Sequence, residues 1–152
     1  SDVYKRQWFL RIYRQIWYVT GREVSSGRDK TYALDRISNL RILDRRFDLP
    51  DNADPHTYFR DYYGIMVNQA EARTVVLRVQ ARQAKYLRAL PLHPSQREEV
   101  NDGYSRFTYR LCLTGDLVSE IISMGSDVVV ESPKELRAMV VTRLRDTIAN
   151  YP

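Results

Sequence analysis

The sequence predicts an α+β protein in which a small β-barrel or strongly bent sheet precedes a β-α-β-β-α-β domain with a C-terminal helix. Residues 8–47 alternate apolar and polar side chains at the period of a strand and are interrupted by turn-forming residues. Beyond residue 66, β-branched segments alternate with segments whose apolar residues recur at helical spacing. The chain of 152 residues suits one ordinary domain or two very small ones. We place the two domains at residues 1–65 and 66–152.

The first domain is predicted to be built around a β-hairpin. Residues 16–19 and 31–37 both alternate at period two, and residues 25–29 between them are turn-forming. Residues 8–15 predict a strand before the hairpin and residues 40–47 a strand after it, whereas residues 1–7 show no period. Four short strands within about fifty residues are typical of a small barrel or a strongly bent sheet.

A short helix over residues 55–62 is predicted to follow a polar linker. Asp54 before Pro55 gives an acidic N-cap with proline at the first helical position, and Gly64 suits the C-terminal cap. We expect its aromatic residues to pack against the barrel rather than contact a ligand: Tyr58, Phe59, Tyr62 and Tyr63.

The second domain is predicted to have the order β-α-β-β-α-β-α, which is the ferredoxin-like split βαβ arrangement with a terminal helix added. Asp102-Gly103 is a strong hairpin turn, and three consecutive valines in the last strand predict burial on both of its faces. The predicted strands are residues 74–80, 97–101, 107–113 and 127–131, and the first two helices are residues 81–90 and 116–124.

The final helix is predicted to begin at a capping box with proline at the first helical position. The box is Ser132-Pro133-Lys134-Glu135. Apolar residues follow at helical spacing, which predicts one apolar face: Leu136, Val140, Leu144, Ile148 and Tyr151.

Composition favours an anion-binding function over catalysis. The net charge is +5, and 20 of the 24 basic residues are arginines, which favour bidentate and stacked contacts. The single Cys112 excludes an internal disulfide and, lying between two leucines, is expected to be a buried structural thiol. His56 and His93 have no zinc-ligand spacing, and we find no catalytic triad, phosphate loop or carboxylate pair with the spacing of metal ligands. The Glu98-Glu99 pair adjoins the predicted hairpin and is expected to be solvated. We therefore expect no enzyme, no cofactor and no metal.

The chain has no apolar run of about 18 residues, as a membrane helix needs, and no signal-peptide pattern. We expect a cytoplasmic protein.

The first domain resembles the WYL domain, which is named for a Trp-Tyr-Leu triplet. The triplet stands here as Trp17-Tyr18-Val19, and Leu34-Asp35-Arg36-Ile37 is similar to the second signature of that family, with its arginine at Arg36. The resemblance implies an Sm-like, SH3-like barrel. The opening strand of that barrel is not recognisable, because residues 1–7 occupy its place. We therefore expect an N-terminally incomplete barrel, or one that a partner chain closes.

The second domain is similar to the ferredoxin-like C-terminal extension that follows the WYL domain in a large group of bacterial transcription regulators. Three markers occur in the expected order: His93-Pro94-Ser95-Gln96, residues 124–130 and residues 132–137. Members of the group usually carry a winged helix-turn-helix domain in front, and no recognition helix is seen here. The resemblance implies an effector-sensing region that is a homodimer and reaches duplex DNA only through that missing domain.

The expected ligand is anionic or nucleic-acid-like, single-stranded nucleic acid being one class that the family resemblance implies. Exposed rings can stack on bases while guanidinium groups neutralise phosphates. Trp17, Tyr18 and Arg36 come from the family signatures, and the other candidates come from their chemistry and inferred proximity. The candidate ligand-binding residues are Tyr13, Arg14, Trp17, Tyr18, Tyr32, Arg36 and Arg45.

Each candidate also has a purely structural explanation. A tryptophan in a strand usually packs in a core, and Arg36 could pair with Asp35 or Asp44. The alternative function is therefore a structural oligomerisation or protein-interaction module without a ligand, in which the arginines are paired internally with Asp35, Asp44 or Asp48.

Overall fold

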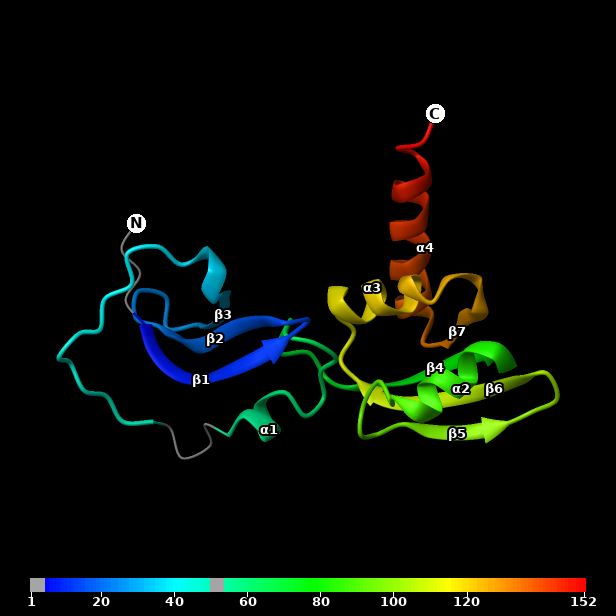
Figure 1. The fold of residues 1–152 in the computed structure, drawn as a ribbon, viewed down its shortest axis with the longest axis horizontal. Helices are drawn as coiled ribbons and strands as arrows, with labels where there is room; N and C mark the ends of the chain where they lie inside the picture. Colours follow the sequence, from blue (N-terminus) through cyan, green and yellow to red (C-terminus); the bar gives the residue numbers. More distant parts are fainter. Residues whose placement is uncertain (1–4, 50–53) are drawn as a thin grey trace. The chain divides into compact units, whose positions relative to one another are not determined.

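The computed structural model describes residues 5–49 and 54–152, with side chains from residue 8 onward. The chain divides into two compact units, residues 1–60 and residues 61–152, and their elements are labelled in Figure 1. The first unit contains a three-stranded antiparallel sheet, and the second contains a four-stranded antiparallel sheet with helices. The predicted α+β class is confirmed. Among the described residues, no helix combines the length and apolar character that crossing a membrane requires.

The sheet of the first unit consists of three strands in chain order: β1 (Lys5–Tyr13), β2 (Ile16–Glu23) and β3 (Asp29–Ala33). The predicted β2–β3 hairpin is confirmed, with Tyr18 opposite Ala33. Arg14 and Gln15 form the β1–β2 turn with φ angles of 47° and 65°, and positive φ at both positions is the geometry that two-residue hairpin turns favour. Strand β1 also includes residues 5–7, where the sequence shows no period.

Two stretches that the sequence predicted as strands are not strands. A 3-10 turn, η1 (Leu34–Arg36), follows β3, and residues 40–47 are irregular. Asn39 has a φ of 54° and turns the chain out of the extended conformation. No described strand pairs with the residues that follow it, so Leu40 and Ile42 are 74% and 96% exposed. An alternating sequence is not sufficient, because a strand needs neighbours for its hydrogen bonds. Within residues 5–49 the structure thus has an open three-stranded sheet, without the fourth strand that would close the predicted barrel.

Helix α1 (Pro55–Tyr58) begins where the sequence predicted. Asp54 caps it, since its Oδ2 accepts hydrogen bonds from the backbone N–H and the hydroxyl of Thr57, both at 2.8 Å. The helix ends one turn earlier than predicted, because its aromatic residues pack in different places. Phe59 packs on Phe9, whereas Tyr62 packs with Ala72 and Cys112 in the second unit. Cys112 is buried, as predicted, and burial raises the pKa of its thiol.

The second unit has the predicted β-α-β-β-α-β-α order, with short 3-10 turn η2 (Gly125–Asp127) before the last strand. Its strand order is β5-β6-β4-β7, and all three neighbouring pairs are antiparallel, which is the ferredoxin-like topology. The elements are β4 (Arg73–Gln80), α2 (Ala81–Ala89), β5 (Arg97–Val100), β6 (Tyr104–Leu111), α3 (Gly115–Ser123), β7 (Val128–Ser132) and α4 (Lys134–Ile148).

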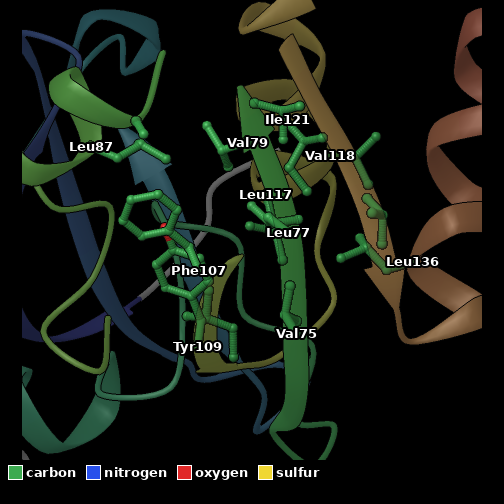
Figure 2. Close-up of a cluster of buried hydrophobic side chains, with 14 residues drawn as sticks. Val75, Leu77, Val79, Leu87, Phe107, Tyr109, Leu117, Val118, Ile121 and Leu136 are labelled. Carbon is green, nitrogen blue, oxygen red and sulfur yellow. The ribbon is translucent and has the colours of Figure 1, made fainter. Parts of the chain in front are cut away.

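One face of this sheet carries the core (Figure 2). Alternate residues of β4 (Val75, Leu77 and Val79) are fully buried. They pack with residues of β6, β7 and the helices: Phe107, Tyr109, Leu111, Val128, Val130, Ala84, Leu87, Leu117, Val118, Ile121 and Leu136. The helices α2 and α3 therefore cover this face. The predicted burial of β7 on both faces is wrong, because Val129 points to the other face and is 43% exposed.

Helix α4 starts one residue later than a capping box requires. Ser132 is still the last residue of β7, paired with Val76, so Pro133 takes the N-cap position and no side chain caps the helix. Only Leu136 of α4 is buried. Val140 is partly buried and packs against the core. Four other apolar residues of the helix are exposed: Met139, Val141, Leu144 and Ile148.

Candidate functional site

The predicted ligand-binding residues in the strands of the first sheet lie on two different faces. Successive side chains of a strand point to opposite faces, so Trp17 and Tyr18 cannot contribute to one surface. Following the pairing register, we define the Phe59 face by Phe9, Arg11, Tyr13 and Tyr18 with Phe59, and the Trp17 face by Leu10, Ile12, Trp17, Val19 and Tyr32.

Aromatic rings close part of the Phe59 face. The ring centroid of Phe9 lies 5.7 Å from that of Phe59 and 5.3 Å from that of Tyr58, and the two rings meet Phe9 edge-on. Trp8 adds a further edge contact with Tyr58 at 6.1 Å. Such pairs contribute about 0.5–1.5 kcal/mol each beyond area burial. The predicted packing of Phe59 is therefore confirmed: it is 4% exposed.

Arg11 is the unusual group on this face. Its guanidinium carbon lies 4.2 Å from the centroid of the Phe59 ring, and burial lowers the pKa of Arg11, with the phenol of Tyr13 acting in the opposite direction. Among the described residues, no carboxylate lies within ion-pair distance of Arg11. In the described chain Arg11 is therefore a half-buried cation that lies against an aromatic ring, and such a charge is costly without a counter-charge.

Tyr13, Arg14 and Tyr18 accompany Arg11. Tyr13 and Tyr18 share its face, and Arg11 is directly opposite Tyr18 across β1 and β2. Arg14, at the adjacent turn, has its guanidinium carbon 5.5 Å from the Tyr13 ring centroid. Three of the predicted residues, Tyr13, Arg14 and Tyr18, thus lie close to Arg11, which was not in the predicted set. The signal that could have found Arg11 is its position two residues before Tyr13 on the same strand face.

The other predicted residues lie elsewhere. Trp17 and Tyr32 are on the Trp17 face, where Trp17 is 49% exposed, so its expected packing in a core is not observed. Arg36 ends η1 and Arg45 lies in the irregular segment, and both are exposed. In the described parts of the chain, Arg36 makes no ion pair with Asp35, Asp44 or Asp48.

A hydrogen-bonded carboxylate lies at the end of the Trp17 face. Glu23 accepts hydrogen bonds from Tyr32 at 3.3 Å and Ser26 at 2.5 Å, and the Nζ of Lys30 is 2.7 Å away. Lys30 first, and Ser26 second, lower the pKa of Glu23 to about 2. Tyr32 is therefore engaged in holding the β2–β3 hairpin together.

This carboxylate predicts an acid dependence of stability. The pKa of Glu23 is about 2 in the folded chain and near 4.5 without its partners, so the unfolded chain takes up the proton first. The stability that ionised Glu23 contributes to the folded chain is fully present above about pH 4.5 and is lost as the pH falls to about 2. We expect the thermal midpoint of the wild type to fall more steeply over this range than that of Glu23→Gln. Equal slopes would contradict the prediction, and the exposed Asp44→Asn serves as the control.

Comparison with known proteins identifies the second unit. The family model of the WCX domain matches residues 71–148, which is half of the chain. Among solved structures, the chain is similar to the proteasome accessory factor B/C (PafBC) of Arthrobacter aurescens, with 22% sequence identity and a TM-score of 0.45. The similarity covers 99% of this chain but 23% of that one, so the chain spans about a quarter of its length. No curated protein matches. The chain belongs to the family of proteins that carry a WCX domain, the C-terminal domain associated with WYL domains.

Proposed function

We propose that the chain is the effector-sensing and dimerising region of a bacterial, cytoplasmic transcription regulator. The WCX domain supports a regulatory role rather than catalysis, because the WYL-like signatures of residues 17–19 and 34–37 precede it in the order that the resemblance implies. The ligand is an anionic or nucleic-acid-like molecule that binds at the Phe59 face. Duplex DNA is reached only through a separate N-terminal domain.

The single observation that carries the ligand assignment is the half-buried guanidinium of Arg11. It lies against Phe59, shares its face with Tyr13 and Tyr18, and has no carboxylate partner in the described chain. An anion placed there supplies the missing counter-charge, and a planar base stacks on the partly exposed tyrosine rings. A ligand that binds one arrangement of the subunits more tightly shifts the population towards it.

The second candidate is an oligomerisation or interaction module without a ligand. The observation that favours it is the apolar Trp17 face, on which Leu10, Ile12 and Trp17 are 46%, 55% and 49% exposed. That candidate also requires the arginines to be paired internally. Arg36 is not paired in that way within the described residues, and this supports the first candidate.

Fluorescence anisotropy of short labelled single-stranded and duplex oligonucleotides, at about 50 and about 200 mM salt, tests the ligand assignment. Arg11→Ala should weaken single-strand binding about 10- to 100-fold, which corresponds to one charged hydrogen-bonded contact of about 1.5–3 kcal/mol. Arg11→Lys keeps the charge but not the planar stack, and should recover only part of the affinity.

The matched control is Arg28→Ala, an exposed arginine in the β2–β3 turn of the same unit. It removes the same charge, so it separates a local contact from a general loss of positive charge. If Arg11→Ala and Arg28→Ala behave alike, the Phe59 face is not the ligand site. If Arg36→Ala alone abolishes binding, the site lies at the end of η1.

A further inference from the structure

The second face of the WCX sheet is uncovered within its unit. The helices α2 and α3 lie with the core on the first face (Figure 2), so the alternate residues of β4 and β6 face away from them. In β4 these are Thr74, Val76, Arg78 and Gln80, and in β6 they are Tyr104, Arg106, Thr108 and Arg110. We name this surface the open sheet face.

Two arginines lie directly opposite each other at the centre of the open sheet face. Arg78 on β4 pairs in register with Arg106 on β6, and these are the two inner strands of the sheet. Like charges in directly opposed positions destabilise a sheet. The positive charge of Arg106 is compensated by Glu131, whose Oε2 lies 2.8 Å from the Nε of Arg106. Arg78 has no ion pair or side-chain hydrogen bond with any described residue, so its charge is left uncompensated by the fold.

Further arginines extend this charge across three strands. Arg97 on β5 is opposite Thr108, and Arg110 on β6 is opposite Thr74, which places both on the open sheet face. Neither side chain has an acidic partner in the described chain. The acidic residues on the face are Glu131 and Glu99, both beside Arg106. The remaining positive charge therefore comes from Arg78, Arg97 and Arg110.

An aromatic ring completes the surface. Tyr104 lies at the end of β6 on this face, and the guanidinium carbon of Arg106 is 5.6 Å from its ring centroid. A partly exposed ring next to guanidinium groups is the arrangement on which an unpaired base stacks while its phosphates are neutralised. Thr108 lies between Arg106 and Arg110 on β6, and Thr74 is opposite Arg110 on β4. Hydroxyl groups at these positions can donate to phosphate oxygens.

We propose that the open sheet face binds the phosphate backbone of a single-stranded nucleic acid, with Arg78, Arg97 and Arg110 as phosphate contacts and Tyr104 as a stacking ring. The exposed face of a sheet fits an extended strand with unstacked bases, whereas duplex readout needs an element that enters a groove. This surface is independent of the Phe59 face, since none of its residues belongs to the first unit.

The test uses the full chain and a short labelled single-stranded oligonucleotide. Arg78→Thr combined with Arg110→Thr should weaken binding at least tenfold and reduce the slope of log affinity against log salt by about 1.4, that is, about 0.7 for each lost phosphate contact. The thermal midpoint should stay the same or rise, because the change removes the repulsion between Arg78 and Arg106.

The matched control is Lys85→Ala combined with Arg143→Ala, which removes two positive charges from α2 and α4, outside the open sheet face. An equal loss of affinity in both double variants would overturn the proposal, as would tighter binding of a duplex or of a polyglutamate peptide. Loss of binding in the threonine variant, with Arg11→Ala unaffected, would support this surface while contradicting the ligand site at the Phe59 face.

Discussion

Gly64→Ala should destabilise the second unit by about 2–5 kcal/mol. Gly64 has a φ of 81°, a conformation that L residues adopt at a cost of about 1–3 kcal/mol. A Cβ at this position would lie 2.5 Å from Oδ2 of Asp116 and 2.8 Å from its Cβ and Cγ. That carboxylate oxygen accepts hydrogen bonds from the backbone N–H groups of Ile65 and Met66, at 2.9 and 2.8 Å. Moving Asp116 aside therefore also breaks the contacts that hold this loop to the start of α3.

Urea denaturation of Gly64→Ala and Gly103→Ala in parallel separates the cost of the clash with Asp116 from the cost of the backbone conformation. Gly103 has a similar φ of 78°, lies in the same unit, and would have nothing within 4 Å of an added Cβ. Its replacement should cost only the backbone term of about 1–2 kcal/mol. The difference between the two variants measures the displacement of Asp116. Equal midpoints would show that Asp116 moves freely and does not anchor the loop.

Local signals in the sequence predicted most of the second unit correctly. Asp102-Gly103 marks a turn because the chain reverses there with a positive φ that glycine tolerates. The alternation of Phe107, Tyr109 and Leu111 is read correctly because one face of β6 is buried. In such elements the period, the turn residues and the burial all agree, which is the condition under which sequence patterns are reliable.

Elements whose structure depends on a neighbour were not predictable in this way. Residues 40–47 alternate like a strand, but no described strand pairs with them. Ser132 has the sequence of an N-cap, yet pairing with Val76 keeps it in β7. In the first case the deciding factor is that the described residues offer no partner strand. In the second case it is pairing with a residue that is far away in the sequence.

The candidate site was predictable only in its chemistry. Arginines and tyrosines on short strands indicated an anion site, but adjacent residues such as Trp17 and Tyr18 point to opposite faces, so a list drawn from one segment mixes two surfaces. Arg11 stands out only once Phe59, far along the chain, is seen to lie against it. The arginines of the open sheet face likewise come from three strands, and their proximity follows from the strand order β5-β6-β4.

Leu136→Ala should cost about 2–5 kcal/mol of unfolding free energy, whereas Leu144→Ala in the same helix should cost less than about 0.5 kcal/mol in the monomer. Leu136 is fully buried among core residues (Figure 2), and Leu144 is 41% exposed. Both substitutions remove the same atoms and change helix propensity equally, so the difference reports burial alone. Urea denaturation measures both, and similar costs would mean that α4 is not anchored through Leu136.

The same pair of variants tests the proposed homodimer. Val141, Leu144 and Ile148 of α4, with Tyr151 just beyond its end, repeat at alternating spacings of three and four residues and are 37%, 41%, 70% and 75% exposed. This is the spacing of the a/d positions of a coiled-coil seam. An α4 from a second copy carries the identical pattern and can cover it. The wild-type midpoint should then rise with protein concentration, and Leu144→Ala should remove that dependence. Leu136→Ala should lower the midpoint at every concentration. A wild-type midpoint independent of concentration would exclude α4 as the dimer contact, because a helix that buries its apolar side chains only on association must gain stability from mass action.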